Sequence, residues 1–202
     1  MAVRARLIYL LRHGEVVRAE TRRFIGHLDV PLSPGGEAQC AVQARRLAAL
    51  RIDALYASDL ERARRSGEII AAPHGLTPRI LPALREMAMG RWEGLTADEI
   101  RAREPDAFRD WMTRIGEFPF PGGESLPDLL ARAGPAFDRI VGASPAGAVA
   151  IVAHGGTNRA LLCRALGVPL DRLLAFGQDY GALSVLEDSA DGWMLRRLNE
   201  RP

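Results

Sequence analysis

Two apolar segments that each run into a histidine and a glycine constrain the fold of this chain most. Residues 7–14 read LIYLLRHG, and residues 148–155 read AVAIVAHG. Each apolar run is typical of a buried β-strand, and ligand sites in open α/β sheets lie beyond the carboxyl ends of the strands. If the two strands are parallel neighbours, His13 and His154 lie at the same sheet edge and face one ligand. One such His-Gly pair is usually an ordinary loop, but two favour a catalytic or binding site.

Strands alternate with helices along the rest of the chain, which predicts an α/β domain with a largely parallel sheet. N-capping residues indicate several helix starts: Ser33 before Pro34, and capping boxes at Thr96 and Ser125. The predicted helices span residues 33–50, 59–72, 125–141 and 157–166, and two more begin at residues 96 and 105. The other predicted strands span residues 54–57, 78–81, 181–186 and 193–198.

The composition suits one globular domain with a full core, because 48% of the 202 residues are hydrophobic and 26% are charged. None of the 27 basic residues is a lysine. A genome rich in G and C explains this bias, so only the position of an arginine carries information about function. The net charge of +2 is small and acids are interleaved with the arginines, so no nucleic-acid partner is predicted.

The cysteines and the N-terminal segment predict a cytoplasmic protein. Cys40 and Cys163 are isolated in the sequence, which favours free thiols in a reducing compartment. Residues 1–6 resemble the start of a signal peptide, but the apolar run behind them is too short and stops at Arg12. No stretch is long enough to span a membrane. No metal-binding motif is present, so neither a metal nor a cofactor is predicted.

Four motifs occur in chain order, each at a predicted strand end or loop. They are RHGE at residues 12–15, SDLERA at 58–63, LRE at 84–86 followed by GRWEG at 90–94, and HG at 154–155. Together they resemble the histidine phosphatase superfamily, with its phosphoglycerate-mutase-like fold, over nearly the whole chain. The resemblance implies a three-layer α/β/α fold with a mostly parallel central sheet. It also implies a single domain, residues 1–202, in which about residues 85–125 form a cap-like insertion over the site.

The resemblance implies a role for each motif residue: His13 as the nucleophile, Arg12, Arg62 and His154 as an anion clamp, and Glu86 as the proton donor. Elementary chemistry agrees with these roles. A neutral imidazole is a competent nucleophile near pH 7, and arginine matches the geometry of a phosphate group. The leaving alkoxide needs a proton, which a carboxylic acid can give.

Further residues are predicted to contact the substrate or its phosphate group: Gly155, Thr21, Arg23 and Gly26. Many relatives have a phosphate-contacting asparagine where this chain has Ala19. That contact is therefore missing here, or it comes from Thr21 or from an arginine of the same loop. A second, smaller departure is Ser66, which stands where a threonine is usual.

Several candidates also have structural explanations. Without the resemblance, Arg62 reads as an exposed helix arginine, and Glu86 reads as the partner of Arg85 or Arg91 in a surface ion pair. Glu93 and Glu15 are the other acids that compete for roles near the site. The remaining histidines and tryptophans are predicted to be structural, packed or exposed; they are His27, His74, Trp92 and Trp111.

The predicted function is a metal-independent phosphomonoesterase that acts on a small phosphorylated metabolite through a phosphohistidine. Residues 122–125 and 178–182 are similar to α-ribazole phosphatases and their broad-specificity relatives, which makes α-ribazole 5'-phosphate a candidate substrate. A phosphoglycerate mutase that uses the same pocket is the first alternative. A catalytically silent phosphate-binding or scaffold protein is the second. A homodimer is left open by the sequence.

Overall fold

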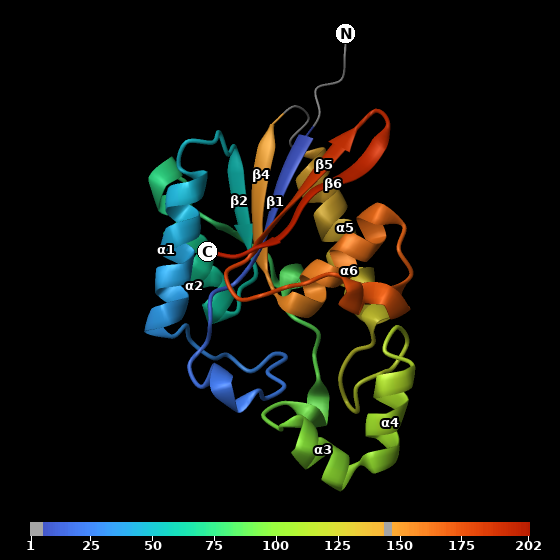
Figure 1. The fold of residues 1–202 in the computed structure, drawn as a ribbon. Coiled ribbons are helices and arrows are strands. Elements are labelled where there is room, and N and C mark those ends of the chain that lie inside the picture. The colour runs from blue at the N-terminus through green and yellow to red at the C-terminus, as the bar shows by residue number, and fades with distance from the viewer. Residues whose placement is uncertain (1–5, 144–146) are drawn as a thin grey trace.

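A six-stranded sheet forms the centre of the molecule (Figure 1). The computed structural model describes residues 6–143 and 147–202, so most of the segment that resembles a signal start lies outside the described residues. The strand order is β3-β2-β4-β1-β5-β6. The strands are β1 (Arg6–Arg12), β2 (Ala54–Ala57), β3 (Arg79–Ile80), β4 (Ala148–Ala153), β5 (Leu183–Ser189) and β6 (Gly192–Glu200).

Strands β1 and β4, which precede the two His-Gly pairs, are direct parallel neighbours. Their register pairs Arg12 with Ala153, so His13 and His154 emerge side by side at the carboxyl edge of the sheet. Strands β2 and β3 continue the parallel part, whereas β5 and β6 form an antiparallel hairpin on the other side of β1. The predicted parallel pairing of the two strands is therefore confirmed.

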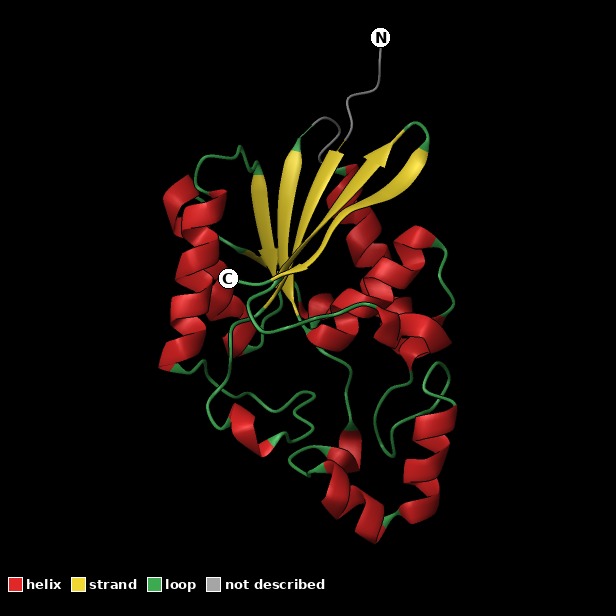
Figure 2. Ribbon diagram, in the orientation of Figure 1, coloured by secondary structure: helices red, strands yellow, loops and turns green. Residues whose placement is uncertain are grey.

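Helices cover both faces of the sheet and produce the predicted three layers (Figure 2). Helices α1 and α2 lie on one face, and α5 and α6 lie on the other (Figure 1). The helices are α1 (Pro34–Leu47), α2 (Glu61–Ala71), α3 (Ala97–Arg103), α4 (Pro105–Thr113), α5 (Leu126–Gly142) and α6 (Gly155–Leu166). Short 3-10 turns occupy residues 19–21, 72–74, 82–84, 90–92 and 170–175.

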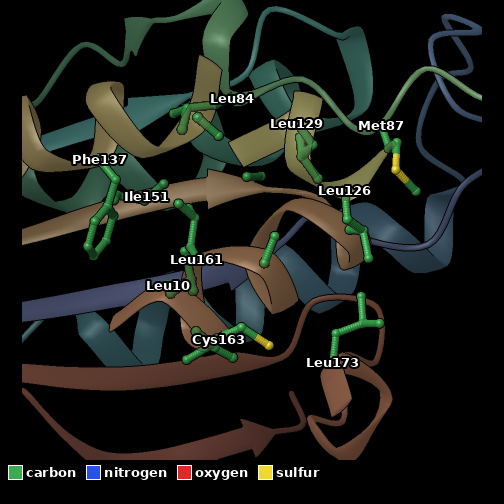
Figure 3. Packing of buried hydrophobic residues seen from close by; sticks show 14 of the residues in the cluster. Leu10, Leu84, Met87, Leu126, Leu129, Phe137, Ile151, Leu161, Cys163 and Leu173 are labelled. Carbon is green, nitrogen blue, oxygen red and sulfur yellow. The ribbon is translucent and has the colours of Figure 1, made fainter. Parts of the chain in front are cut away.

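Alternation along the strands divides the core between the two faces. In β1, Ile8 and Leu10 belong to the larger cluster beneath α5 and α6, whereas Tyr9 and Leu11 pack against α1 and α2. Figure 3 shows part of the larger cluster, in which Leu10 and Ile151 of the sheet lie near Leu161 of α6. A strand buried on both faces reads as a continuous apolar run, which is the pattern that the sequence shows.

The structure confirms the three predicted N-caps. The Ser33 hydroxyl accepts a hydrogen bond from the amide of Gly36, and complete capping boxes are present at Thr96 and Ser125. Helix α6 differs from the prediction because it begins at Gly155 and not at residue 157. The reason is that His154 itself is the extended N-cap residue, so the helix starts directly at the end of the strand. The 3-10 segment at residues 170–175 was not predicted.

Helices α3 and α4 lie away from the sheet, beyond the carboxyl ends of its strands (Figure 1). They are joined to the rest by an aromatic cluster in which Trp92 is fully buried. Trp92 contacts Phe24, Trp111 and Phe120 at ring-centroid distances of 5.3–6.0 Å. This cluster packs α4 and the residue 90–92 turn against the Phe24 loop. Within the described residues, no helix has both the length and the hydrophobicity needed to cross a lipid bilayer.

Candidate active site

His13 lies directly after β1 and is only 3% exposed. Its Nδ1 is 2.7 Å from the carbonyl oxygen of Gly14. Because a carbonyl oxygen can only accept, Nδ1 carries the proton and Nε2 carries the lone pair. Burial, together with the charges of Arg12 and Arg62, holds the pKa of His13 well below 6.5. The ring is therefore neutral near pH 7, with a nucleophilic nitrogen available.

Close backbone packing holds the His13 loop in place. A Cβ on Gly14 would lie 2.3 Å from the carbonyl oxygen of Gly36, so only glycine fits there. The amide of Gly14 donates to the Ser66 hydroxyl at 3.1 Å, and that hydroxyl donates to the carbonyl of Arg62 at 2.7 Å. Ser66 thus links the loop to the helix that carries Arg62.

His154 follows β4 and is fully buried. Its ring centroid is 5.1 Å from that of His13, in an edge-on arrangement. Burial and, after it, the charge of Arg62 hold the pKa of His154 well below 6.5. Neither ring nitrogen has a hydrogen-bond partner among the described residues. A buried polar group usually has such a partner, so these nitrogens are available to a ligand.

Two arginines flank the histidine pair, and each is fixed by backbone carbonyls. Arg62, 1% exposed, donates to the carbonyls of Gly26 and Leu28, each at 2.7 Å. Arg12 donates to the carbonyl of Gln178 at 2.6 Å. In both side chains the buried Nε has no partner within the part of the chain that the structure describes. Two unpaired N–H groups and a buried imidazole thus lie near His13, an arrangement that can bind an anion.

Glu86 approaches the same site from the segment after β3. Its carboxylate accepts hydrogen bonds from the amides of Gly156 at 2.9 Å, Thr157 at 3.1 Å and Met87 at 3.0 Å. The first two amides belong to the first turn of α6, whose N-terminus attracts negative charge. A Cβ on Gly156 would lie 2.5 Å from a Glu86 carboxylate oxygen. The glycine therefore allows this close approach.

Arg132 of α5 fixes the backbone that carries Glu86. Its guanidinium donates to the carbonyls of Ala83 and Arg85 at 2.9 Å and to that of Glu86 at 2.7 Å. It also forms a bidentate ion pair with Glu124, in which two guanidinium nitrogens donate to the two carboxylate oxygens at 2.7 and 2.8 Å. On the opposite side, Nε2 of His27 lies 2.7 Å from the Glu86 carbonyl and donates to it. His27 is thus a structural residue of this segment.

The two competing acids have other contacts. A Glu93 oxygen accepts from the amides of His27 at 2.8 Å and Met89 at 3.0 Å, which ties two loops together. Glu15 accepts a hydrogen bond from the Ser33 hydroxyl at 3.0 Å beside the start of α1. Neither acid belongs to the wall of the cavity above His13, whereas Glu86 does.

This cavity has a volume of about 610 Å³. Its wall contains four of the predicted catalytic residues, Arg12, His13, Arg62 and Glu86, together with Arg23 and Gly26. Six further wall residues were not among the predicted site residues: Arg22, Phe24, Ile25, Met89, Asp179 and Tyr180. Tyr180 makes a cation–π contact with Arg12, because its ring centre is 3.8 Å from the Arg12 guanidinium carbon. The only signal for it in the sequence was its place in the 178–182 motif.

The other predicted contact residues lie around this cavity. Gly155 is buried beside Arg12, since a Cβ on Gly155 would lie 3.5 Å from Nε of Arg12. The Thr21 hydroxyl donates to the carbonyl of Arg18 at 2.7 Å, within its own turn. Arg23 donates to the carbonyl of Gly94 at 2.6 Å and pairs with Glu99 at 2.9 Å. Thr21 and Arg23 thus have local partners in this conformation.

No cluster of three or more histidine, cysteine or acidic side chains is arranged to hold a metal ion within residues 6–143 and 147–202. The charged side chains of the cavity wall are instead four arginines, Arg12, Arg22, Arg23 and Arg62, and two carboxylates, Glu86 and Asp179. The neutral imidazole of His13 lies among them, and the buried ring of His154 is not part of the wall but has its centroid 5.1 Å from that of His13. Such a set can bind a phosphate group, offer it a nucleophile and exchange a proton, which are the requirements of phosphoryl transfer.

Comparison with known proteins agrees with this chemistry. The family model described as "Histidine phosphatase superfamily (branch 1)" matches residues 8–201. The chain belongs to this superfamily, and it is a phosphoric monoester hydrolase of the histidine phosphatase type.

Three curated relatives differ in what their names say. Phosphoserine phosphatase 1 of Hydrogenobacter thermophilus is 29% identical, over 95% of this chain and 91% of the relative. Glucosyl-3-phosphoglycerate phosphatase of Mycobacterium tuberculosis is 34% identical, over 87% of this chain and 82% of the relative. Phosphoglycerate mutase-like protein 4 of Arabidopsis thaliana is 37% identical, over 78% and 70%. A solved α-ribazole phosphatase from Shigella flexneri is 25% identical, with a TM-score of 0.87 and 96% of each chain covered.

Proposed function

We propose that this protein hydrolyses a small phosphorylated metabolite, without a metal ion, through a phosphohistidine on Nε2 of His13. One observation carries the proposal. The His13 ring lies close to three side chains that each keep a buried nitrogen without a partner among the described residues: Nε of Arg12, Nε of Arg62, and both ring nitrogens of His154. A phosphate group bound there gains charge-assisted hydrogen bonds from these nitrogens.

In the first step, Nε2 of His13 attacks phosphorus and the ester P–O bond breaks. The departing oxygen takes a proton from the carboxyl group of Glu86, and the arginines stabilise the charge on the phosphoryl oxygens. In the second step, the Glu86 carboxylate takes a proton from water as that water attacks phosphorus. The P–N bond then breaks, and phosphate and neutral His13 are restored. The substrate candidate is α-ribazole 5'-phosphate, supported by the likeness to the Shigella enzyme.

The experiment compares the wild type with His13→Ala and His13→Asn on p-nitrophenyl phosphate. We expect both variants to lose at least about 10³-fold in kcat, because the chemistry needs the covalent step. Rapid acid-free quenching with ³²P-labelled substrate should trap a phosphoenzyme that is labile in acid and stable in base. Full activity of His13→Ala, or activity that EDTA removes and added metal restores, contradicts the mechanism. No activity of the wild type on any phosphomonoester favours a silent phosphate-binding protein.

A further inference from the structure

A second cavity, of about 520 Å³, adjoins the one above His13. The two share a stretch of wall made of six residues: Ala19, Arg22, Arg23, Phe24, Ile25 and Tyr180. A phosphomonoester bound at His13 must direct its leaving group away from the nucleophile, because attack is in line with the departing oxygen. A neighbouring cavity with a common wall is a place that such a group can occupy.

The wall of this second cavity is largely apolar. Outside the shared stretch, its side chains include Val17, Leu28 and Val30. Val17 is 38% exposed and Leu28 is 42% exposed, so both keep apolar surface in contact with water. The side chains of Phe24 and Ile25, in the shared stretch, are also apolar. Apolar surface of this kind binds an apolar group by removing it from water.

The charged side chains in the wall of the second cavity are all positive. Three arginines belong to it, Arg18, Arg22 and Arg23, and no acid does among the described residues. Arg23 is partly neutralised by its pair with Glu99, but the wall as a whole remains positive. Such a wall repels an ammonium group and accepts an uncharged or anionic one.

Ala19 contributes a small apolar side chain to the boundary between the cavities, beside Arg22 and Arg23. Ala19 belongs to both walls, and its methyl group is smaller than the asparagine side chain expected there from the family resemblance. The turn that carries it is flanked by Arg18 and Arg22, whose φ angles are 58° and 48°. Non-glycine residues adopt this left-handed conformation uncommonly, and it is frequent in functional loops.

We infer that the second cavity binds the leaving group, and that the preferred substrate is a phosphomonoester of an apolar alcohol that carries no positive charge. This inference rests on the proposed phosphatase function. An aminoalkyl phosphate without a carboxylate, such as phosphoethanolamine, is the substrate that the arginine-bearing wall disfavours most. Phe24, Ile25 and Leu28 are among the apolar wall residues that would contact this leaving group.

The test uses three alkyl phosphates whose alcohols are all poor leaving groups: ethyl phosphate, 3-phenylpropyl phosphate and phosphoethanolamine. We expect kcat/KM for 3-phenylpropyl phosphate to exceed that for ethyl phosphate at least about tenfold, as burial of several apolar carbons in a pocket allows. Phosphoethanolamine should be the poorest of the three. Equal values for all three, or a preference for phosphoethanolamine, overturn the inference.

Variants locate the selectivity. Leu28→Asp should reduce the ratio between 3-phenylpropyl and ethyl phosphate and should improve the relative use of phosphoethanolamine. Val17→Asp provides the same test if Leu28→Asp does not fold. The matched control is Met112→Asp on α4, a residue that is 62% exposed and lies outside both cavity walls. An unchanged ratio in both cavity variants places the leaving group elsewhere.

The two proposals fail in different ways. If His13→Ala abolishes hydrolysis of ethyl and p-nitrophenyl phosphate while the selectivity is absent, the phosphatase function holds and only the apolar subsite is wrong. If the wild type hydrolyses none of these esters, the phosphatase function itself is wrong.

Discussion

The Nδ1 of His13 donates its proton to the carbonyl oxygen of Gly14 at 2.7 Å. This one contact decides which ring nitrogen can react, because it leaves the lone pair on Nε2. The contact depends on a glycine that packs against Gly36 and hydrogen-bonds to Ser66. The proposed nucleophile is therefore oriented by the backbone and not by a carboxylate.

Stability should decrease as the pH falls below about 6.5, where the imidazoles of the unfolded chain begin to bind protons. Burial, and then neighbouring arginines, hold the pKa values of His13 and His154 well below this in the folded protein. Between the folded and unfolded pKa values the unfolded chain binds more protons, so the free energy of unfolding decreases with falling pH. Above about pH 6.5 both imidazoles are largely neutral in the folded and in the unfolded chain. The free energy of unfolding then no longer changes with pH through these two groups.

Urea unfolding across this pH range measures the effect. His154→Gln removes one of the two titrations and should flatten the decrease, whereas the exposed-residue variant Met112→Gln should retain the slope of the wild type. A His154→Gln profile parallel to that of the wild type contradicts the prediction.

Glu86→Gln should slow alkyl phosphates by about 10²-fold or more and slow p-nitrophenyl phosphate much less. The reason is that p-nitrophenolate leaves without a proton, whereas an alkoxide does not. The measurement is kcat for 3-phenylpropyl phosphate and p-nitrophenyl phosphate in each protein. Glu93→Gln is the control, because Glu93 lies outside the cavity wall and ties two loops together. Equal slowing of both substrates moves the acid role away from Glu86.

Arg132→Met should mimic part of the Glu86→Gln phenotype although Arg132 is absent from the cavity wall. Arg132 holds the carbonyls of Ala83, Arg85 and Glu86, so its loss releases the backbone that orients the carboxylate. We expect about a tenfold loss in kcat for alkyl phosphates, a smaller loss for p-nitrophenyl phosphate, and about 1–3 kcal/mol of lost stability.

Arg139→Met, an exposed substitution on the same helix, is the matched control for Arg132. A purely structural role for Arg132 predicts lost stability with equal effects on both substrates. That result shows that Arg132 supports the fold and does not position Glu86.

The strand pattern predicted the site residues at the strand ends, and the family resemblance added Arg62 and Glu86, but neither predicted the contacts of Tyr180 and Arg132. His13, Arg12 and His154 follow apolar strands that local periodicity reveals, and parallel pairing then brings them together. The role of Tyr180 depends on how the 177–182 loop returns beside Arg12, a contact between residues from opposite ends of the chain. No local pattern encodes such a contact. The same holds for Arg132, whose acceptors are backbone carbonyls without any sequence signature.

The protein should act as a phosphatase and not as a phosphoglycerate mutase. A mutase must hold a second anionic group of its intermediate and exclude water from the phosphohistidine. The segment between Gly94 and Gly122 contains four arginines that could serve this purpose, Arg101, Arg103, Arg109 and Arg114. Three of them pair with acids three or four positions away on the same segment, namely Asp98, Asp106 and Asp110.

All four of these arginines are exposed, and none of them belongs to the wall of the cavity above His13. This segment therefore contributes no arginine that could hold a second anionic group at the cavity, and we expect hydrolysis to outrun transfer to a second acceptor. The measurement incubates the protein with 3-phosphoglycerate and a trace of 2,3-bisphosphoglycerate and follows the products by phosphorus NMR. We expect inorganic phosphate to form faster than 2-phosphoglycerate, and the ratio to be unchanged in Arg109→Ala. If 2-phosphoglycerate forms first and Arg109→Ala suppresses it, the cap supplies the second anion site and the protein is a mutase.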